Sequence, residues 1–242
     1  MLSLIFPTVC IHCHQPIFTK DAIAENDYQH AMASYVCEKC ISDFQSCHDI
    51  QCHRCGEAVS IDSKAKTCKA CEKYHESFDK VSFVGLYQGT FKQLIHLYKF
   101  QNKRQLAKPF ATLLLQKLNQ CQKDFFPIDI IAPVPLHISR LRERGFNQAL
   151  LILWQWSDFL PKIEPGLLIR KRSTQSQINL TKAQRFINMI SAFQVNPNIS
   201  VEGKRILLVD DVFTTGATVH GCAQVLIENG ANCVNVLTLA RA

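Results

Sequence analysis

Residues 206–219, with the sequence ILLVDDVFTTGATV, constrain the fold more than any other part of this chain. Their continuous apolar start is typical of a strand buried in a parallel sheet. A Thr/Gly turn follows, and an amphipathic pattern over residues 219–228 then predicts a helix that ends at Gly230. Because a buried strand, a tight turn and a helix make up the repeating unit of α/β folds, we expect a ligand at the carboxyl end of this strand.

The same alternation runs through the chain from residue 76 onwards. Apolar runs predict strands at 81–87, 128–134, 166–170 and 234–239, and a period of about 3.6 residues predicts helices at 92–100, 105–118, 141–159 and 181–190. Strands that alternate with helices indicate an α/β fold with a mostly parallel, twisted sheet covered by helices on both faces.

The turn after the strand at 206–210 has the composition of a phosphate-binding loop. Its backbone N–H groups and the positive end of the next helix dipole favour an anion, and Gly216 lets the main chain approach a ligand closely. Thr214, Thr215 and Thr218 add hydroxyl donors around Ala217. The chain contains neither G-x-x-x-x-G-K-[ST] nor G-x-G-x-x-G, which argues against the common loops for nucleoside triphosphates and dinucleotides.

Two adjacent acids, Asp210 and Asp211, lead directly into this turn. Such a pair can accept hydrogen bonds from the two hydroxyls of a ribose, and it can hold a divalent cation directly or through water. A sugar diol beside a phosphate describes a 5-phosphoribosyl group. The alternative interpretation is a structural strand–turn–helix unit that carries two surface acids.

Cysteine spacing predicts a metal-binding region before residue 75. Eight of the twelve cysteines form four C-x2-C pairs, namely Cys10/Cys13, Cys37/Cys40, Cys52/Cys55 and Cys68/Cys71. Such pairs are typical of structural zinc sites, whose thiolates require a reducing compartment. Four pairs allow one or two zinc ions. Redox-active or merely buried thiols are the alternative.

The spacing leaves two arrangements of the cysteine pairs open. In a sequential arrangement, the Cys52/Cys55 knuckle, which Gly56 follows, is separated from the Cys68/Cys71 pair by a 12-residue loop. The first two pairs would then be joined across a 23-residue loop. In an interleaved arrangement, the first pair joins the third and the second joins the fourth. Four thiolates leave no open coordination position, so we expect a structural metal rather than a catalytic one.

A change of composition near residues 72–80 predicts two units, a zinc-binding module at 1–75 and an α/β domain at 76–242. The first has 7 Lys/Arg against 9 Asp/Glu and the second has 20 against 11, so an anionic partner is expected on the second. No apolar stretch reaches the roughly 18–20 residues of a membrane helix, and the opening residues do not resemble a signal peptide. We therefore expect a cytoplasmic protein that does not span a membrane.

The segment VDDVFTTGAT resembles the signature loop of the type I phosphoribosyltransferases, and nearly the whole chain resembles the ComF/GntX family. The PVPL...R...RGFNQ pattern of that family matches Pro133, Val134, Pro135, Leu136, Arg140, Arg144, Gly145, Phe146, Asn147 and Gln148. Its R...T..Q..L....R..N...AF pattern matches Arg170, Thr174, Gln177, Leu180, Arg185, Asn188, Ala192 and Phe193. The pair Lys99–Phe100 matches its KF pair.

The resemblance implies a type I phosphoribosyltransferase fold that binds phosphoribosyl pyrophosphate (PRPP) together with Mg2+. The implied PRPP-binding residues are Asp210, Asp211, Thr214, Thr215, Gly216, Ala217 and Thr218. The implied pyrophosphate and flexible-loop residues are Pro135, Arg140, Arg144, Arg170, Gln177 and Arg185. Arginine forks suit phosphate oxygens and would stabilise pyrophosphate as it leaves. Thr214 stands where purine-salvage relatives place an acid that acts on the base, so a reaction of that kind is disfavoured.

Three functions are consistent with the resemblance. The first is a role in DNA uptake and natural transformation, acting on incoming single-stranded DNA in the cytoplasm, with a DNA-uptake helicase or channel protein as a partner that could bring the chain to the inner membrane. The second is a Mg2+-dependent phosphoribosyltransferase whose acceptor the sequence does not identify. The third is a PRPP sensor that changes its affinity for a protein partner.

Overall fold

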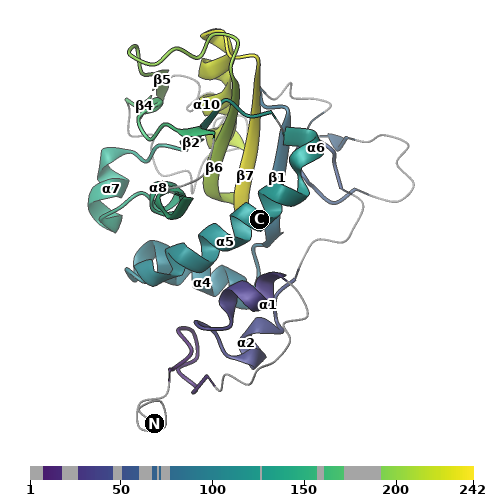
Figure 1. Cartoon of the computed structure of the whole chain (residues 1–242), viewed down its shortest axis with the longest axis vertical. Helices are drawn as coiled ribbons and strands as arrows, with labels where there is room; N and C mark the ends of the chain where they lie inside the picture. Colours follow the sequence, from purple (N-terminus) through teal and green to yellow (C-terminus); the bar gives the residue numbers. More distant parts are fainter. Residues whose placement is uncertain are drawn as a thin grey trace.

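The computed structural model describes residues 8–17, 27–45, 51–59, 67–69, 71, 77–125, 127–156, 161–171 and 192–242. Its centre is a five-stranded sheet in the order β1-β7-β6-β2-β3 (Figure 1). The strands are β1 (Lys80–Leu86), β2 (Ile130–Pro133), β3 (Lys162–Ile163), β6 (Arg205–Phe213) and β7 (Cys233–Arg241). All four pairings are parallel, so the carboxyl ends of the strands lie at one edge, as the sequence pattern predicts.

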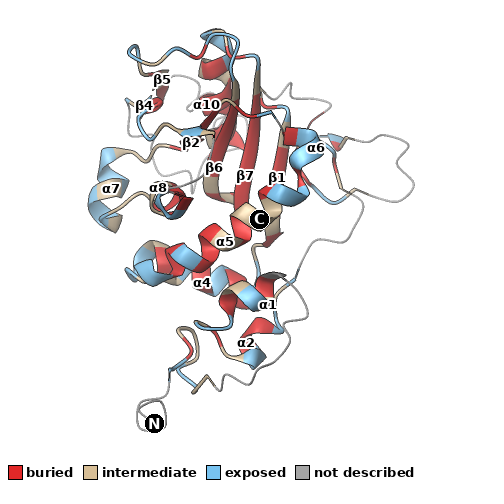
Figure 2. Cartoon of the chain, in the orientation of Figure 1, coloured by how far each residue is buried: buried red, intermediate tan, exposed pale blue. Residues whose placement is uncertain are grey.

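Helices cover both faces of the sheet. On one face lie α4 (Gly89–Phe100), α5 (Ala107–Gln120) and α8 (Gln148–Leu153), which bury Leu207 and Val209 of β6. On the other face lies α10 (Ala217–Glu228), which buries Ile206 and Leu208. This alternation follows from the two-residue period of a strand. Figure 2 shows the result, because β6, β7 and β1 are buried along almost their whole length.

One predicted helix is wrong in its extent. Residues 141–159 do not form a continuous helix, because α7 (Ile138–Arg144) ends at Gly145 and α8 begins after Asn147. Gly145 adopts φ 77°, a left-handed conformation that glycine tolerates best. Asn147 then caps α8 by accepting a hydrogen bond from the backbone N–H of Leu150 (3.3 Å). A 3-10 turn, Trp154–Trp156, follows α8.

Two further predictions of strands need correction. The segment at 166–170 does form a strand, β4 (Leu168–Arg170), but it pairs antiparallel with β5 (Phe193–Val195) outside the main sheet. The strand predicted at 206–210 extends to Phe213, so both acids belong to β6 itself. The predicted helix at 181–190 and the site residues Gln177 and Arg185 lie outside the described residues.

The amino-terminal residues pack directly against the sheet and its helices. Short helices α1 (Asp27–Met32) and α2 (Glu38–Ile41) lie beside α4 and α5 (Figure 1). The outer edge of β1 is also covered, since Val81 donates its backbone N–H to the carbonyl of Arg54 (2.7 Å) and Leu86 to that of Gln45 (3.1 Å). The remaining short elements are a 3-10 turn, Arg104–Leu106, and α6 (Gln122–Phe125).

None of the helices in the described ranges is long and apolar enough to cross a membrane.

Candidate functional site

The end of β6 places its two acids on opposite faces of the sheet. Alternation from Leu208 and Val209 turns Asp210 toward the α10 face and Asp211 toward the α4 face; it does not continue beyond the acids, since Val212 packs on the α4 side and Phe213 on the α10 side. The neighbours of the two carboxylates agree with this placement of the acids. Asp211 lies 2.8 Å from the Nζ of Lys99 on α4, whereas Asp210 lies close enough to Cys222 of α10 and to Arg170 of β4 to influence their pKa values.

Asp211 is held inside the protein by its ion pair. The side chains of Asp211 and Lys99 are only 9% and 12% exposed, so the pair is largely shielded from water. The sequence suggested the pair Lys99–Phe100 only as a family match, without a role. In the structure, Lys99 lies near the carboxyl end of α4, where the helix dipole also favours a cation, and pairs with Asp211 of β6.

Asp210 has a different environment, because no cation of the described residues forms an ion pair with it. Burial and the neighbouring carboxylate of Asp211 raise the pKa of Asp210 to about 7, while Lys99 and Arg144 act in the opposite direction. One carboxylate oxygen of Asp210 accepts a hydrogen bond from the backbone N–H of Asp211 (2.8 Å). The end of β6 thus holds a second carboxylate whose charge the protein only partly compensates.

The loop after β6 is short, since only residues 214–216 separate the strand from α10. Gly216 adopts φ 79°, and a Cβ there would come within 2.8 Å of the Phe213 ring, so the turn requires glycine. Thr214 is exposed, and Thr215 and Thr218 are partly exposed, so all three threonines reach the surface beside the first backbone N–H groups of α10. Ala217 is buried and contributes no side chain to the surface of the loop.

Arginines from two other segments interact electrostatically with Asp210. Arg144, at the end of α7, donates to Gln148 (2.9 Å) and lies over the Phe100 ring (5.0 Å), and its buried Nε has no hydrogen-bond partner among the described residues. Arg170 lies over the Phe193 ring (5.3 Å). Burial lowers the pKa of Arg170 and Arg140 lowers it further, whereas Asp210 raises it. These charges therefore influence one another at the carboxyl edge of the sheet.

The loop after β2 reaches the same edge. Val134 donates its backbone N–H to the carbonyl of Val209 (2.9 Å), and Asn147 donates its side-chain N–H to the carbonyl of Val134 (3.0 Å). Pro135 follows at once and is partly exposed. Arg140 is more peripheral, because its described ion pair is with Glu143, one turn along α7 (3.3 Å). Of the predicted arginines in the described part of the chain, Arg144 and Arg170 thus lie nearest the acids.

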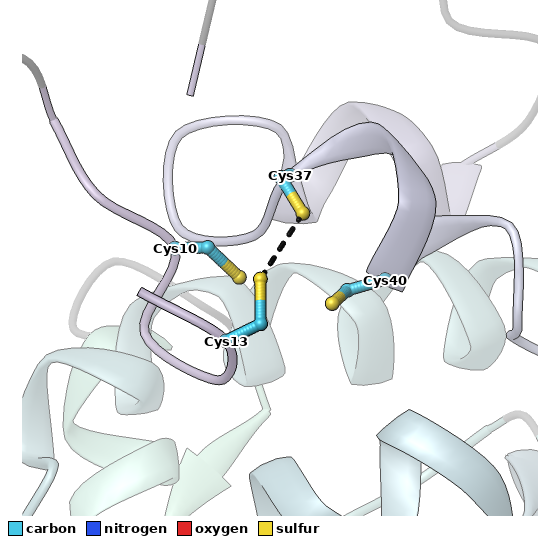
Figure 3. A group of neighbouring side chains, drawn as sticks. All are labelled: Cys10, Cys13, Cys37 and Cys40. Carbon is cyan, nitrogen blue, oxygen red and sulfur yellow. Dashed lines mark hydrogen bonds between the residues drawn. The ribbon is translucent and has the colours of Figure 1, made fainter. Parts of the chain in front are cut away.

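The eight paired cysteines form two groups, and their arrangement is sequential. Cys10, Cys13, Cys37 and Cys40 make up the first centre, and Cys52, Cys55, Cys68 and Cys71 make up the second. Within each centre the sulfur atoms lie within 4.8 Å of one another. Figure 3 shows the four sulfur atoms of the first centre converging from two separate segments. The interleaved arrangement is therefore wrong for this structure.

The geometry of both centres fits tetrahedral zinc. The Sγ atoms of Cys13 and Cys37 are 3.5 Å apart and those of Cys55 and Cys68 are 3.6 Å apart. Four sulfurs around zinc at about 2.3 Å lie about 3.8 Å from one another. Burial opposes ionisation of Cys10, yet backbone N–H groups, including that of Cys13, lower its pKa to about 7. The corresponding residue of the second centre, Cys52, has its pKa lowered to about 7 in the same way.

The two centres begin with the same backbone turn. Cys10 donates its N–H to the carbonyl of Gln15 (2.8 Å), and Cys52 donates to that of Glu57 (2.7 Å). The residue after the second cysteine is left-handed in both turns, His14 with φ 62° and Gly56 with φ 68°. Only Gly56 was recognisable from the sequence, because histidine seldom marks such a position. Cys47 lies outside the described residues.

Comparisons with known proteins agree with this architecture. Residues 164–242 match the phosphoribosyl transferase domain family. The chain is 32% identical over 240 residues to Competence protein F of Haemophilus influenzae, covering 96% of each chain. It is 32% identical over 193 residues to DNA utilization protein YhgH of Salmonella typhi, covering 78% of this chain and 83% of that one. It is 28% identical over 214 residues to Competence protein ComFC of Bacillus subtilis, covering 86% and 84%.

Proposed function

The chain belongs to the ComF/GntX family, and from that premise we propose that it binds PRPP with Mg2+ at the carboxyl end of β6 and acts in DNA uptake. One observation carries the ligand assignment. Asp210, near the end of β6, is a carboxylate with a raised pKa whose charge interacts with those of Arg144 and Arg170. A site that presents a poorly compensated acid and several arginines together suits a ligand with both hydroxyls and phosphates.

In this proposal, Asp210 and Asp211 accept hydrogen bonds from the ribose hydroxyls. The ribose would reach the two carboxylates at the end of β6, where Asp210 is partly exposed and the ion pair with Lys99 holds Asp211 in place. Mg2+ would supply positive charge to the pyrophosphate oxygens when bound. The incomplete compensation of Asp210 fits such a cation, since a hard dication favours carboxylate oxygens.

The 5-phosphate would occupy the loop between β6 and α10. The N–H groups at the start of α10 point out of the helix end, and the loop includes Gly216, so the backbone itself can hold an anion. The hydroxyls of Thr214, Thr215 and Thr218, which are exposed or partly exposed residues, would add donors. The buried Ala217 would act only through its backbone N–H.

The pyrophosphate would lie between the loop after β2 and the arginines. The buried Nε of Arg144 needs a hydrogen-bond acceptor, which a phosphate oxygen would provide. Arg170 approaches from β4, and Pro135 and Arg140 border the loop after β2. We retain Gln177 and Arg185 as proposed pyrophosphate ligands, on the family pattern alone.

We propose that each cysteine centre holds one structural zinc ion, and that residues 1–75 form the zinc-binding module beside the ligand-binding domain at 76–242. Both centres have four thiol donors and their sulfur atoms leave no position for a substrate. The metal ions would fix the short segments that cover α4, α5 and the edge of β1.

The proposed role in DNA uptake rests on the names of the relatives, two of which are competence proteins and one a DNA utilization protein. The net charge of +7 is compatible with a polyanionic partner such as single-stranded DNA. The test is binding of a labelled single-stranded oligonucleotide at several salt concentrations. Affinity that does not fall with salt would argue against direct DNA binding.

Calorimetric titration with PRPP and Mg2+ tests the ligand site. The wild-type protein is expected to bind, and the double variant Asp210→Asn/Asp211→Asn is expected to lose at least tenfold in affinity, because two acceptors become amides. A matched control is Asp129→Asn, which alters an acid at the opposite end of the sheet that pairs with Arg205 (3.0 Å). Equal binding by wild type and the double variant would remove the ligand from this site.

A phosphoribosyltransferase reaction is the second candidate, favoured by the domain match over 164–242. The arginines could stabilise departing pyrophosphate, but Thr214 offers no carboxylate to accept a proton from an acceptor base. Pyrophosphate release that requires both Mg2+ and a defined acceptor would establish turnover. Binding without release would leave the chain as a PRPP-binding or PRPP-sensing protein.

A further inference from the structure

The second cysteine centre is connected to the loop after β6 through two charged side chains. Glu57 follows the knuckle of Cys52 and Cys55, and its carbonyl accepts the backbone N–H of Cys52 (2.7 Å). The carboxylate of Glu57 forms an ion pair with the guanidinium of Arg241, the last residue of β7. The two residues are 184 positions apart in the sequence, so only the fold brings them together.

Arg241 contacts the loop from two sides. Its Nη1 donates a hydrogen bond to the carbonyl oxygen of Thr214 (3.0 Å), and its guanidinium lies over the ring of Phe213 (5.2 Å). That ring in turn packs against Gly216, where an added Cβ would meet it at 2.8 Å. Arg241 is only 9% exposed. One buried cation therefore holds both the residue that begins the loop and the ring that supports its glycine.

We propose that Arg241 is a positioning residue for the phosphate loop and that Glu57 orients it, so that the second cysteine centre helps to set the conformation of the loop. The proposal rests on the proposed function of the loop as the site of the 5-phosphate. Arg241 has no direct contact with the ligand in this account. It acts through the backbone of Thr214. The carbonyl of Thr214 must point away from the phosphate so that the N–H groups that follow can face it.

The geometry distinguishes this role from that of an ordinary stabilising ion pair. The side chain of Glu57 is 53% exposed, and exposed ion pairs contribute little to the stability of a fold. Loss of Glu57 should therefore change the loop and its ligand affinity much more than the unfolding temperature. A general structural role would predict the reverse.

A double-mutant cycle on the full-length protein tests the connection. Glu57→Gln, Arg241→Gln and the double variant are compared by titration with PRPP and Mg2+ and, without ligand, by amide hydrogen exchange in residues 212–219. We expect Glu57→Gln to weaken binding by roughly threefold, and Arg241→Gln by roughly tenfold or more, because the latter also loses a charged hydrogen bond. The double variant should bind like Arg241→Gln alone, because Glu57 acts through Arg241.

Two further variants complete the test. Arg241→Lys keeps the charge but loses the fork that reaches both partners, so it should bind with an affinity between those of wild type and Arg241→Gln. Arg205→Lys is the matched control, because it removes an arginine fork, on Asp129, at the other end of the sheet. It should lower the unfolding temperature without changing ligand affinity or exchange at 212–219.

Three outcomes would overturn the proposal. These are wild-type affinity and exchange in both single variants, independent and additive effects of Glu57 and Arg241, or an Arg205→Lys effect on the loop equal to that of Arg241→Lys. If the wild-type protein binds no PRPP, the proposed function fails, and hydrogen exchange in the ligand-free variants still decides whether Arg241 holds the loop.

A last variant isolates the metal. Cys68→Ser removes one donor of the second centre and leaves Glu57 in place. When zinc content falls by one ion per chain, faster exchange at 212–219 is expected, as in Glu57→Gln. Unchanged exchange at 212–219 after loss of that zinc would refute the claim that the second cysteine centre helps to set the conformation of the loop.

Discussion

Replacing Asp210 by asparagine is expected to stabilise the ligand-free protein while it weakens ligand binding. Burial and the charge of Asp211 raise the pKa of Asp210 from 3.8 to about 7. A carboxyl whose pKa is raised on folding binds its proton more tightly in the native state, so its ionisation costs stability at neutral pH. Asparagine has the same shape, carries no charge, and can still accept the N–H of Asp211.

The size of the effect follows from the shift in pKa. About three pKa units at about 1.4 kcal/mol each give an upper limit of about 4 kcal/mol, reached when the pH exceeds the folded pKa of about 7. This cost in folding free energy is absent below about pH 4, where the carboxyl of Asp210 is protonated in both the folded and the unfolded state. It reaches about half of its full value near pH 5.5. The pKa of about 7 already includes the opposing effects of Lys99 and Arg144, so a stabilisation of up to about 4 kcal/mol is expected at pH 8.

Urea denaturation of wild type and Asp210→Asn at pH 4.5, 6 and 8 measures this difference. The variant should gain stability relative to wild type as the pH rises, with little change in the slope against urea. The double variant Asp210→Asn/Asp211→Asn should be less stable than Asp210→Asn, because it leaves Lys99 buried without a carboxylate. The reasoning would be refuted if the difference in unfolding free energy between wild type and Asp210→Asn were independent of pH, or if Asp210→Asn were less stable than wild type.

Three other predictions concern the rest of the molecule. Cys52→Ala should lower the zinc content, measured by atomic absorption, by one ion per chain and leave the other centre occupied. Hydrogen bonds from Arg205 lower the pKa of Asp129 in the folded protein. The stability that Asp129 adds is therefore present above its unfolded pKa and is lost as the pH falls through the lower folded pKa. In a chemical denaturation series, the stability difference between wild type and Asp129→Asn should shrink on acidification. Gly216→Ala, at φ 79° and against the Phe213 ring, should lower stability by about 1–3 kcal/mol and weaken binding of PRPP in the calorimeter.

Much of the α/β architecture follows from local sequence pattern, and the exceptions have local causes. The continuous apolar run of β6 and the periodic helices α4, α5 and α10 are where residue spacing predicts them, because each buries one face or both against the sheet. The helix predicted at 141–159 is interrupted because Gly145 and Asn147 form a cap, and apolar periodicity on both sides conceals it. The position of β4 outside the main sheet depends on β5, a partner far along the chain.

The candidate site is predictable in its loop and less so in its surroundings. The acids, threonines and glycine of residues 210–218 are contiguous, so one segment reveals them. Alternation from Leu208 and Val209 predicts opposite faces for the two acids, but it fails at Val212 and Phe213, so their neighbours in the fold are needed to place them. The ion pairs of Lys99 with Asp211 and of Glu57 with Arg241 join distant segments, and composition or spacing within one segment carries no signal of such contacts.

The position of Asp210 and Asp211 on the two sides of one strand has a mechanical consequence. A single peptide bond there separates a carboxylate that is ion-paired with α4 from one that lies close enough to α10 to raise the pKa of Cys222. A small molecule that engages both must bridge the two helical layers around the strand end. Its arrival would couple their unfolding, so saturation with ligand should make denaturation of α4 and α10, followed by hydrogen exchange, occur as one cooperative event.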